Sequence, residues 1–250
     1  MVAALQTYCI LATGLYALTG LNRSEGLGLC GDKGCKNMEQ TRDIRREYTF
    51  TQLRRADLAA RPLQQFEVWL QQALAGAVED ATAMTVATVD GAGQPSARIV
   101  LLKEFDQHGF VWFSDARSEK GQALAANPKA ELLFYWREME RQIRIRGTVS
   151  RISEAQTEAY FRSRPRASQL AAATSVQSQP IESRAQLEAR FSALEQSSKD
   201  QVTRPDAWGG FCLVPEAYEF WQGRESRLHD RFRYRQMLDS DTWLIERLQP

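Results

Sequence analysis

The spacing of hydrophobic positions changes along the chain, and each change predicts a different kind of element. From Pro62 onward, apolar residues recur every three or four positions, which is typical of a helix that buries one face, and proline is favoured at a first helical position. Between residues 82 and 149 the apolar positions form short runs with turn signals between them. Short strands joined in sequence by tight turns predict an antiparallel sheet.

The same patterns assign elements along the chain. Strands are expected at 82–89, 97–102, 110–113, 130–136, 142–149, 208–214, 217–221, 231–234 and 242–248, and helices at 62–76, 118–126, 153–165 and 182–197. Ser153 and Gln156 have the spacing of a capping box, which opens a helix, and the helix at 182–197 is expected to be amphipathic. Because the strands are short and the turn signals frequent, we predict a mainly β fold with α-helices, an antiparallel barrel with flanking helices.

The first forty residues differ in character from the rest. Residues 1–21 are mildly apolar, but no basic residue precedes Arg23, and polar residues and glycines interrupt the run. A secretory signal needs basic residues before its apolar stretch, and a membrane span needs a longer unbroken one. We interpret residues 1–40 as a disordered extension or the product of an upstream start codon, with a targeting peptide as the alternative. Residues 41–250 are expected to form one domain.

Composition excludes several classes of protein. The 250 residues are 43% hydrophobic and 25% charged, which is typical of a soluble globular protein, and the net charge of +1 argues against a polycation that binds nucleic acid. Only 6 of the 32 basic residues are lysine. Arginine matches phosphate and carboxylate oxygens with a planar fork, although genomic base composition is an alternative explanation.

The usual catalytic and metal-binding motifs are missing from the sequence. Two histidines cannot form a His-rich metal site, and Cys30 and Cys35 have no second Cys or His pair nearby, so we predict no metal. No nucleophile elbow, P-loop or G-x-G-x-x-G is present. A phosphate would therefore have to be held by Arg, Lys, Ser and Thr side chains. The cysteine pattern gives no sign of an oxidising compartment, and we predict a cytoplasmic protein.

Two groups of residues could hold such a phosphate. Arg98 and Lys103 stand at the ends of an apolar strand, and positions five apart point to opposite faces, so they could serve two ligands or two ends of one site. Tyr160, Arg164 and Ser168 are spaced four apart and could converge as an anion cradle. The alternatives are solubilising charges at a strand end and a solvated helix end.

A third group lies between residues 219 and 231. Trp221 could serve as an apolar plate beside a planar ring. Arg227, His229 and Arg231 alternate, so on a strand they would share one face. Because three such groups repel one another unless an anion lies among them, this stretch favours an anionic ligand.

From about Ile44 to Pro250 the chain resembles the pyridoxine (pyridoxamine) 5′-phosphate oxidase family. The motifs that carry the resemblance are RREY at 45–48, RIVLLK at 98–103, YFRSRPRASQ at 160–169, Gln177 with Ser178, WGGF at 208–211, and FWQG followed by RLHDRF that ends at Phe232. They occur in family order. The resemblance implies a split β-barrel and a homodimer with FMN at two subunit-interface sites, and it makes residues from about 208 to 250 a dimerisation and substrate segment.

The resemblance also implies roles for individual residues. Those assigned to FMN are Arg98, Ile99, Val100, Leu101, Lys103, Phe113, Ser114, Lys120, Gln142, Gln177, Ser178, Trp221 and Arg231. Those assigned to the substrate are Arg45, Tyr48, Lys103, Tyr160, Arg164, Ser168, Arg227 and His229. Arg227 and His229 are the expected catalytic residues, the first orienting the reacting carbon and the second holding the substrate. Arg45 and Tyr48 are expected to close over the site as a lid.

The chain departs from the family pattern at one position. Where the family commonly has Ser-Arg-Lys, this chain has Ser118, Glu119 and Lys120. The arginine that would share the FMN phosphate is thus a carboxylate here. A glutamate that faces the phosphate would weaken FMN binding, and one turned to solvent would not.

The implied reaction is oxidation of pyridoxine or pyridoxamine 5′-phosphate to pyridoxal 5′-phosphate, with hydride transfer from the 4′ carbon to flavin N5, O2 as acceptor and H2O2 as product. Two other functions stay open. One is a related flavin oxidase or reductase with another substrate, which would not need the substrate residues together. The other is a non-enzymatic binder of pyridoxal phosphate or nucleic acid. The near-zero net charge argues against nucleic acid, and we predict neither nucleic-acid nor membrane binding.

Overall fold

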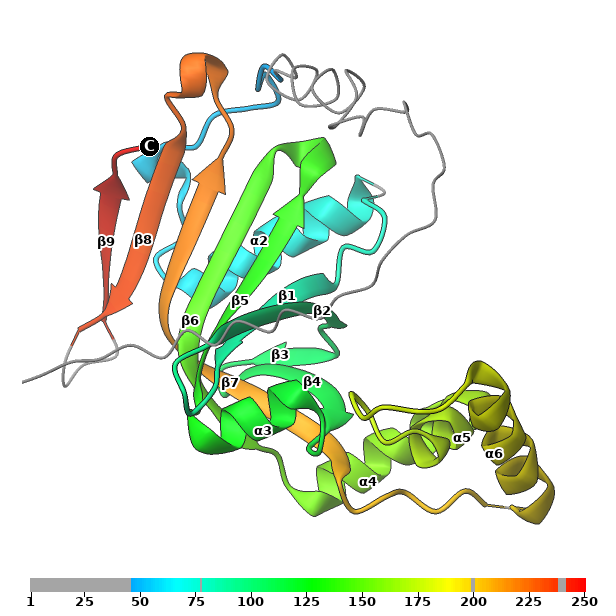
Figure 1. The fold of residues 1–250 in the computed structure, drawn as a ribbon. Helices are drawn as coiled ribbons and strands as arrows, with labels where there is room; N and C mark the ends of the chain where they lie inside the picture. The colour runs from blue at the N-terminus through cyan, green and yellow to red at the C-terminus, as the bar shows by residue number, and fades with distance from the viewer. Residues whose placement is uncertain (1–45, 77, 199–200, 238–241) are drawn as a thin grey trace, which may run out of the picture. The chain divides into compact units, whose positions relative to one another are not determined.

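The computed structural model describes residues 46–76, 78–198, 201–237 and 242–250 (Figure 1). The predicted extension at 1–40 and the predicted substrate residue Arg45 lie outside the described residues. The described helices are α2 (Pro62–Ala75), α3 (Glu119–Ala126), α4 (Glu154–Ser163), α5 (Arg166–Thr174) and α6 (Arg184–Ser197). The described strands are β1 (Ala83–Val89), β2 (Pro95–Leu101), β3 (Glu104–Asp106), β4 (Gly109–Asp115), β5 (Lys129–Trp136), β6 (Arg141–Arg151), β7 (Trp208–Gln222), β8 (Asp230–Gln236) and β9 (Trp243–Leu248).

The strands form one antiparallel sheet in the order β2-β1-β5-β6-β7-β4-β3, and β8 and β9 extend it from β7 (Figure 1). This confirms the predicted fold class of an antiparallel barrel with flanking helices. The hairpins β1–β2 and β5–β6 join strands that are neighbours in sequence, as the turn signals predicted. Among the described helices, none is long and apolar enough to cross a membrane.

One strand replaces two predicted ones. The runs at 208–214 and 217–221 belong to the single strand β7, which has 15 residues and pairs with β6, β4 and β8. The pairing of β6 with β7 shifts register between Arg146 and Gly147, opposite Pro215. A β-bulge absorbs the extra residue, so the proline does not end the strand. Gly147 lies so close to the Val214 carbonyl that a Cβ there would collide with it.

Helix α2 packs against the sheet and forms the main core with it. Phe66 is fully buried, and its ring lies 4.9 Å from that of Phe110 on β4 and 5.1 Å from that of Phe134 on β5. Trp69 contacts Phe220 on β7 edge-to-face at 5.3 Å. The predicted helical spacing is thus confirmed for the buried face, although Leu74 at the end of the helix is exposed.

Helices α4, α5 and α6 lie between β6 and β7 in sequence and surround a second, smaller core (Figure 1). This core consists of Phe161, Leu170, Val202 and Trp208. The prediction that residues 182–197 are an amphipathic helix is only partly right, because α6 exists but buries none of its residues. Phe191 and Leu194 pack only partly against the small core. Strand β3 and helix α5 were not predicted.

Candidate active site

A cavity of about 520 Å³ lies where β2, β4, α3 and α4 meet. Its lining residues are Ser96, Ala97, Arg98, Ile99, Val100, Leu101, Lys103, Phe113, Ser114, Glu119, Lys120, Tyr160, Arg164, Gln177, Ser178 and Trp208. Most of the residues predicted for the FMN and for the substrate phosphate are therefore brought together. Arg98 and Lys103 line the same cavity although they were predicted to point to opposite faces, because β2 ends at Leu101 and strand alternation does not reach Lys103.

Arg98 and Lys120 form the cationic wall of the cavity. Arg98 Nη1 donates to Thr88 Oγ1 over 2.8 Å and to the Val86 carbonyl over 3.2 Å, which fixes the guanidinium beside β1. Lys120 is only 5% exposed, and its Nζ donates to Ser114 Oγ over 3.0 Å. Burial and the nearby charge of Arg98 lower the pKa of Lys120. Two cations held this close and partly desolvated form a favourable site for an anion.

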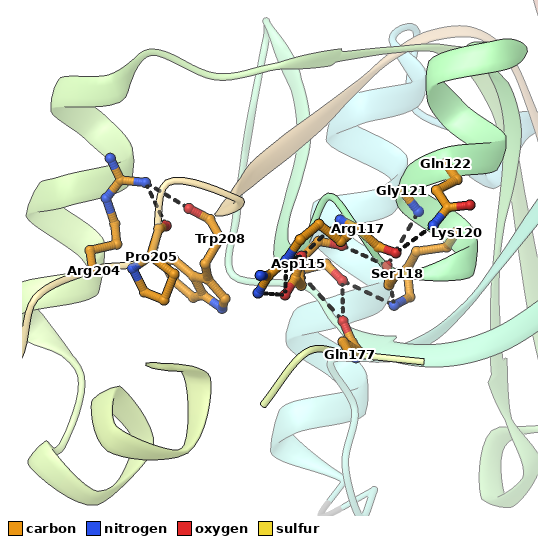
Figure 2. A network of polar contacts seen from close by, with 11 residues as sticks. Asp115, Arg117, Ser118, Lys120, Gly121, Gln122, Gln177, Arg204, Pro205 and Trp208 are labelled. Atoms are coloured by element: carbon orange, nitrogen blue, oxygen red, sulfur yellow. Dashed lines mark hydrogen bonds and ion pairs between the residues drawn. The ribbon is translucent and has the colours of Figure 1, made fainter. Parts of the chain in front are cut away.

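The loop after α5 is attached to this wall through Gln177 (Figure 2). Ser114 Oγ donates to Gln177 Oε1 over 2.9 Å, and the backbone N–H of Asp115 points at the same oxygen over 3.3 Å. Ser178 follows in the left-handed region with φ of 68°. These contacts place the predicted FMN residues Ser114, Gln177 and Ser178 side by side with Lys120.

An aromatic stack forms another part of the cavity wall. Phe113 stacks on Tyr160 with ring centroids 3.7 Å apart, and on Trp208 at 5.3 Å. Arg204 holds the Trp208 backbone, because its Nη1 donates to the Trp208 carbonyl over 2.7 Å (Figure 2). Burial raises the pKa of Tyr160, so its hydroxyl stays protonated at neutral pH and can donate a hydrogen bond. The sequence motif at 208–211 gave no sign that Trp208 would line the site.

The guanidinium of Arg164 also lies at this wall. Its guanidinium lies 4.7 Å from the Trp208 ring centre, and its Nη1 is buried without a hydrogen-bond partner in the described part of the chain. Burial lowers the pKa of Arg164. A buried guanidinium nitrogen without a hydrogen-bond partner is costly unless an anion pairs with it. Arg164 is the C-cap residue of α4, which ends near Pro165 as predicted, but Ser168 on α5 does not line the cavity.

The remaining predicted residues form a second group around the turn between β7 and β8. The Tyr48 ring meets the Trp221 ring edge-on at 5.6 Å and the His229 ring at 5.2 Å. Tyr48 also lies against Gly223, where a Cβ would come within 2.5 Å of the Tyr48 ring. The chain after Tyr48 is anchored nearby, because the Phe50 backbone N–H donates to Glu140 Oε2 over 2.9 Å.

Arg227 and His229 do not lie on a strand, so the condition under which they would share one face with Arg231 is not met. Arg227 belongs to a 3-10 turn and has φ of 60°, and His229 precedes β8, which begins at Asp230. His229 Nδ1 instead accepts a hydrogen bond from the Arg224 backbone N–H over 3.1 Å. Burial, followed by the charges of Arg227 and Arg231, lowers the pKa of His229. The imidazole is therefore neutral at pH 7, with its proton on Nε2.

Three predicted FMN residues stand in a row across the sheet beside this turn. Gln142 on β6 pairs with Trp221 on β7, which pairs with Arg231 on β8. Arg231 is fixed by Glu219, whose Oε1 accepts from Nε over 2.9 Å and from Nη2 over 2.8 Å. Glu219 is a positioning residue that the sequence analysis missed.

The two groups are separate within one chain. Among the described residues, neither the Gln142–Trp221–Arg231 row nor Arg227, His229 and Tyr48 contribute to the cavity lining. Trp208 begins β7 and borders the cavity, whereas Trp221 lies near the other end of that strand. At about 3.3 Å per residue, about 40 Å of strand separates them.

Comparison with solved structures defines the class. PhzG from Burkholderia lata 383, solved with tetrahydrophenazine-1-carboxylic acid, superposes with a TM-score of 0.73 at 29% identity over 78% of this chain and 95% of PhzG. A pyridoxamine 5′-phosphate oxidase-related, FMN binding protein from Nostoc punctiforme has the same fold, with a TM-score of 0.62 at 20% identity over 77% of this chain and 98% of that one. The chain is a split-barrel protein with a cationic cavity.

Comparison of sequences defines the family. Residues 70–198 match the family described as pyridoxamine 5′-phosphate oxidase, and residues 208–250 match the C-terminal dimerisation region of pyridoxine 5′-phosphate oxidase. The pyridoxine/pyridoxamine 5′-phosphate oxidase of Ralstonia pickettii is 51% identical over 213 residues, which are 85% of this chain and 100% of the relative. That of Teredinibacter turnerae is 52% identical over 83% of this chain and 98% of the relative. The chain belongs to the pyridoxine/pyridoxamine 5′-phosphate oxidase family of oxidoreductases.

Proposed function

We propose that the protein oxidises pyridoxine 5′-phosphate or pyridoxamine 5′-phosphate to pyridoxal 5′-phosphate, with FMN as cofactor, O2 as electron acceptor and H2O2 as product. When bound, FMN supplies the redox chemistry, accepting a hydride from the 4′ carbon of the substrate at flavin N5. The observation that carries the proposal is the buried Arg164 Nη1, which has no hydrogen-bond partner among the described residues and lines one cavity with Arg98, Lys103 and Lys120. Four cations in one cavity suit a pair of phosphorylated ligands.

The residues on β2 and α3 fit the cofactor. Arg98 and Lys120 would hold the FMN phosphate, and Ser114, Gln177 and Ser178 would continue the polar wall around it. Within the described residues β2 pairs only with β1, so its second edge is free. The backbone groups of Ile99, Val100 and Leu101 on that edge would contact the flavin, and Phe113 would lie against it from β4. Lys103, at the end of this segment, would serve both cofactor and substrate.

The residues on α4 fit the substrate phosphate. Arg164 would pair with it, and the protonated Tyr160 hydroxyl would donate to one of its oxygens. Lys103 would add a third donor. Ser168 would join only after a shift of α5, because it does not line the cavity.

A second copy of the chain would complete each site. Residues 208–250 match a dimerisation region, which supports a homodimer. Gln142, Trp221 and Arg231 of the partner subunit would meet the flavin, and Arg227 and His229 of the partner subunit would lie over the substrate ring. His229 would hold the substrate and Arg227 would orient the 4′ carbon, with Tyr48 and Arg45 closing over them. We further propose that the protein acts in the cytoplasm and binds neither nucleic acid nor a membrane.

A different substrate on the same barrel is the second candidate, since PhzG shares the fold at 29% identity. A substrate without a phosphate would leave Arg164 Nη1 unpaired, which favours the phosphorylated substrate. The test is anaerobic: the FMN-saturated protein is mixed with pyridoxine 5′-phosphate, and in a separate sample with pyridoxamine 5′-phosphate, and its visible absorbance is followed. Bleaching that reverses in air, with pyridoxal 5′-phosphate formed, supports the proposal. A flavin that binds and stays yellow with either substrate would refute it in favour of another substrate.

A further inference from the structure

The wall that carries Arg98 and Lys120 also carries a carboxylate. Among the described residues that line the cavity, Glu119 is the only acidic one. Its Oε1 lies 3.6 Å from Arg98 Nη2, and the Glu119 side chain is 70% exposed whereas that of Arg98 is 20% exposed. The Glu119 carboxylate therefore contacts the guanidinium assigned to the cofactor phosphate, although most of its side chain is exposed.

The hydrogen bonds of Arg98 determine which of its nitrogens can bind a phosphate. Its Nη1 is occupied by the Val86 carbonyl, Thr88 Oγ1 and the Ser96 carbonyl. Nη2, which bonds Ser96 Oγ, is the nitrogen that faces Glu119. A phosphate that approaches Arg98 from the cavity and bonds Nη2 would meet the carboxylate at this same nitrogen. The carboxylate and the phosphate would compete for one donor.

A local structural reason for Glu119 also exists. It is the first residue of α3, where a negative charge is favourable near the helix N-terminus, and Ser118 caps that helix. This reason is independent of any ligand. It does not remove the repulsion between the Glu119 carboxylate and a phosphate bound in the same cavity.

We propose that Glu119 is a specificity-determining residue of the cofactor site. Its carboxylate competes with the cofactor phosphate for Arg98, so it lowers the affinity for FMN and leaves the affinity for riboflavin, which has no phosphate, unchanged. The inference rests on the proposed function, because it takes FMN as the ligand. Repulsion between the carboxylate and a phosphate falls on the phosphate end alone. The contacts of the flavin ring with β2 are the same for FMN and riboflavin, so riboflavin reports on the ring without the phosphate.

Flavin fluorescence titrations of the cofactor-free protein at low salt test this. We expect Glu119→Gln to bind FMN about tenfold more tightly than the wild type, because the substitution removes one negative charge close to the phosphate. The affinity for riboflavin should not change. Glu119→Arg should bind FMN more tightly still. The matched control is Glu195→Gln, which removes the same charge from an exposed position on α6 and should change neither affinity.

Salt gives a second readout. At about 1 M salt the screening length is about 3 Å, so the advantage of Glu119→Gln for FMN should largely disappear. Equal FMN affinity in wild type and Glu119→Gln, or an equal gain for riboflavin, would overturn the inference and leave the proposed function standing. If FMN binds none of these proteins, both fail together. If FMN binds Glu119→Gln but not the wild type, the inference holds in its strongest form.

Discussion

Trp208 and Trp221 lie near opposite ends of the single strand β7, and each belongs to a different half of the proposed site. Trp208 borders the cavity with the phosphate-binding residues, and Trp221 pairs with Arg231 beside the turn that carries Arg227 and His229. Because β7 is one continuous strand, the two tryptophans stand far apart along it, and Trp221 does not line the cavity. A pair of chains can bring one half of each together.

Lys120→Met should weaken FMN binding. The substitution removes a buried cation that contacts Ser114, and a charge-assisted hydrogen bond to phosphate is worth about 10- to 100-fold in affinity. Riboflavin binding should change little. Equilibrium titration by flavin fluorescence measures both. Lys129→Met is the control, since Lys129 is an exposed lysine paired with Glu216 outside this cavity. Equal losses for FMN and riboflavin would show that Lys120 supports the fold and does not bind phosphate.

Arg164→Met should separate stability from function. Arg164 Nη1 is buried and has no hydrogen-bond partner within the described part of the chain, and replacement of a partly buried charge by an apolar side chain is often neutral or stabilising. The ligand-free protein should therefore keep or raise its Tm, while KM for pyridoxine 5′-phosphate rises about 10- to 100-fold. Thermal scans and steady-state kinetics check the two parts. A large fall in Tm with unchanged KM would mean that Arg164 is structural.

Gly223→Ala should displace the Tyr48 ring, which lies 2.5 Å from where the new Cβ would stand. Loss of its edge-on contacts with Trp221 and His229 should lower kcat/KM by about tenfold, the worth of one or two aromatic pairs. Gly91→Ala is the control, because a Cβ there meets Ala126 at an ordinary 3.6 Å. The double variant with Tyr48→Ala should be no worse than Tyr48→Ala alone. Additive losses would speak against this coupling.

His229 should titrate below its ordinary pKa of 6.5, because burial and the charges of Arg227 and Arg231 disfavour its protonated form. A lower pKa in the folded chain means that the unfolded chain binds more protons. This contribution to stability is thus present above about pH 6.5 and is lost as pH falls through the folded-state pKa. With two histidines in the chain, NMR of the ring protons resolves His229, assigned by its loss in His229→Asn. A midpoint above 6.5 would contradict the described surroundings.

The sequence predicted the regular parts of this protein well. Phe66 and Leu70 follow helical spacing and are buried, and the hairpins at β1–β2 and β5–β6 follow their turn signals. The cavity residues from Arg98 to Gln177 were identified through the family resemblance, and the structure brings them together. Local spacing was sufficient for features that lie within a single helix or hairpin.

The rest depended on contacts that local spacing does not encode. Pro215 reads as a strand break, yet a bulge opposite Gly147 carries β7 through it. Arg227 and His229 alternate in sequence, yet a turn with positive φ at Ser226 and Arg227 removes them from the strand. The role of Trp208 depends on Phe113, which is distant in sequence, as well as on the nearby Arg204. The role of Glu219 depends on Arg231, which lies on the next strand. Glu119 was identified as a departure, but only the structure shows that it faces Arg98.

Complementation between two inactive variants tests the two-chain site most directly. Arg98→Ala removes the cavity half and Arg227→Ala removes the turn half, so each pure variant should form almost no pyridoxal 5′-phosphate. After subunit exchange, half of the dimers are mixed, and one of the two sites in each mixed dimer is intact. The mixture should recover about a quarter of the wild-type activity in a two-fold symmetric dimer. Confirmed exchange with no activity above that of the separate variants would contradict a site shared between two chains.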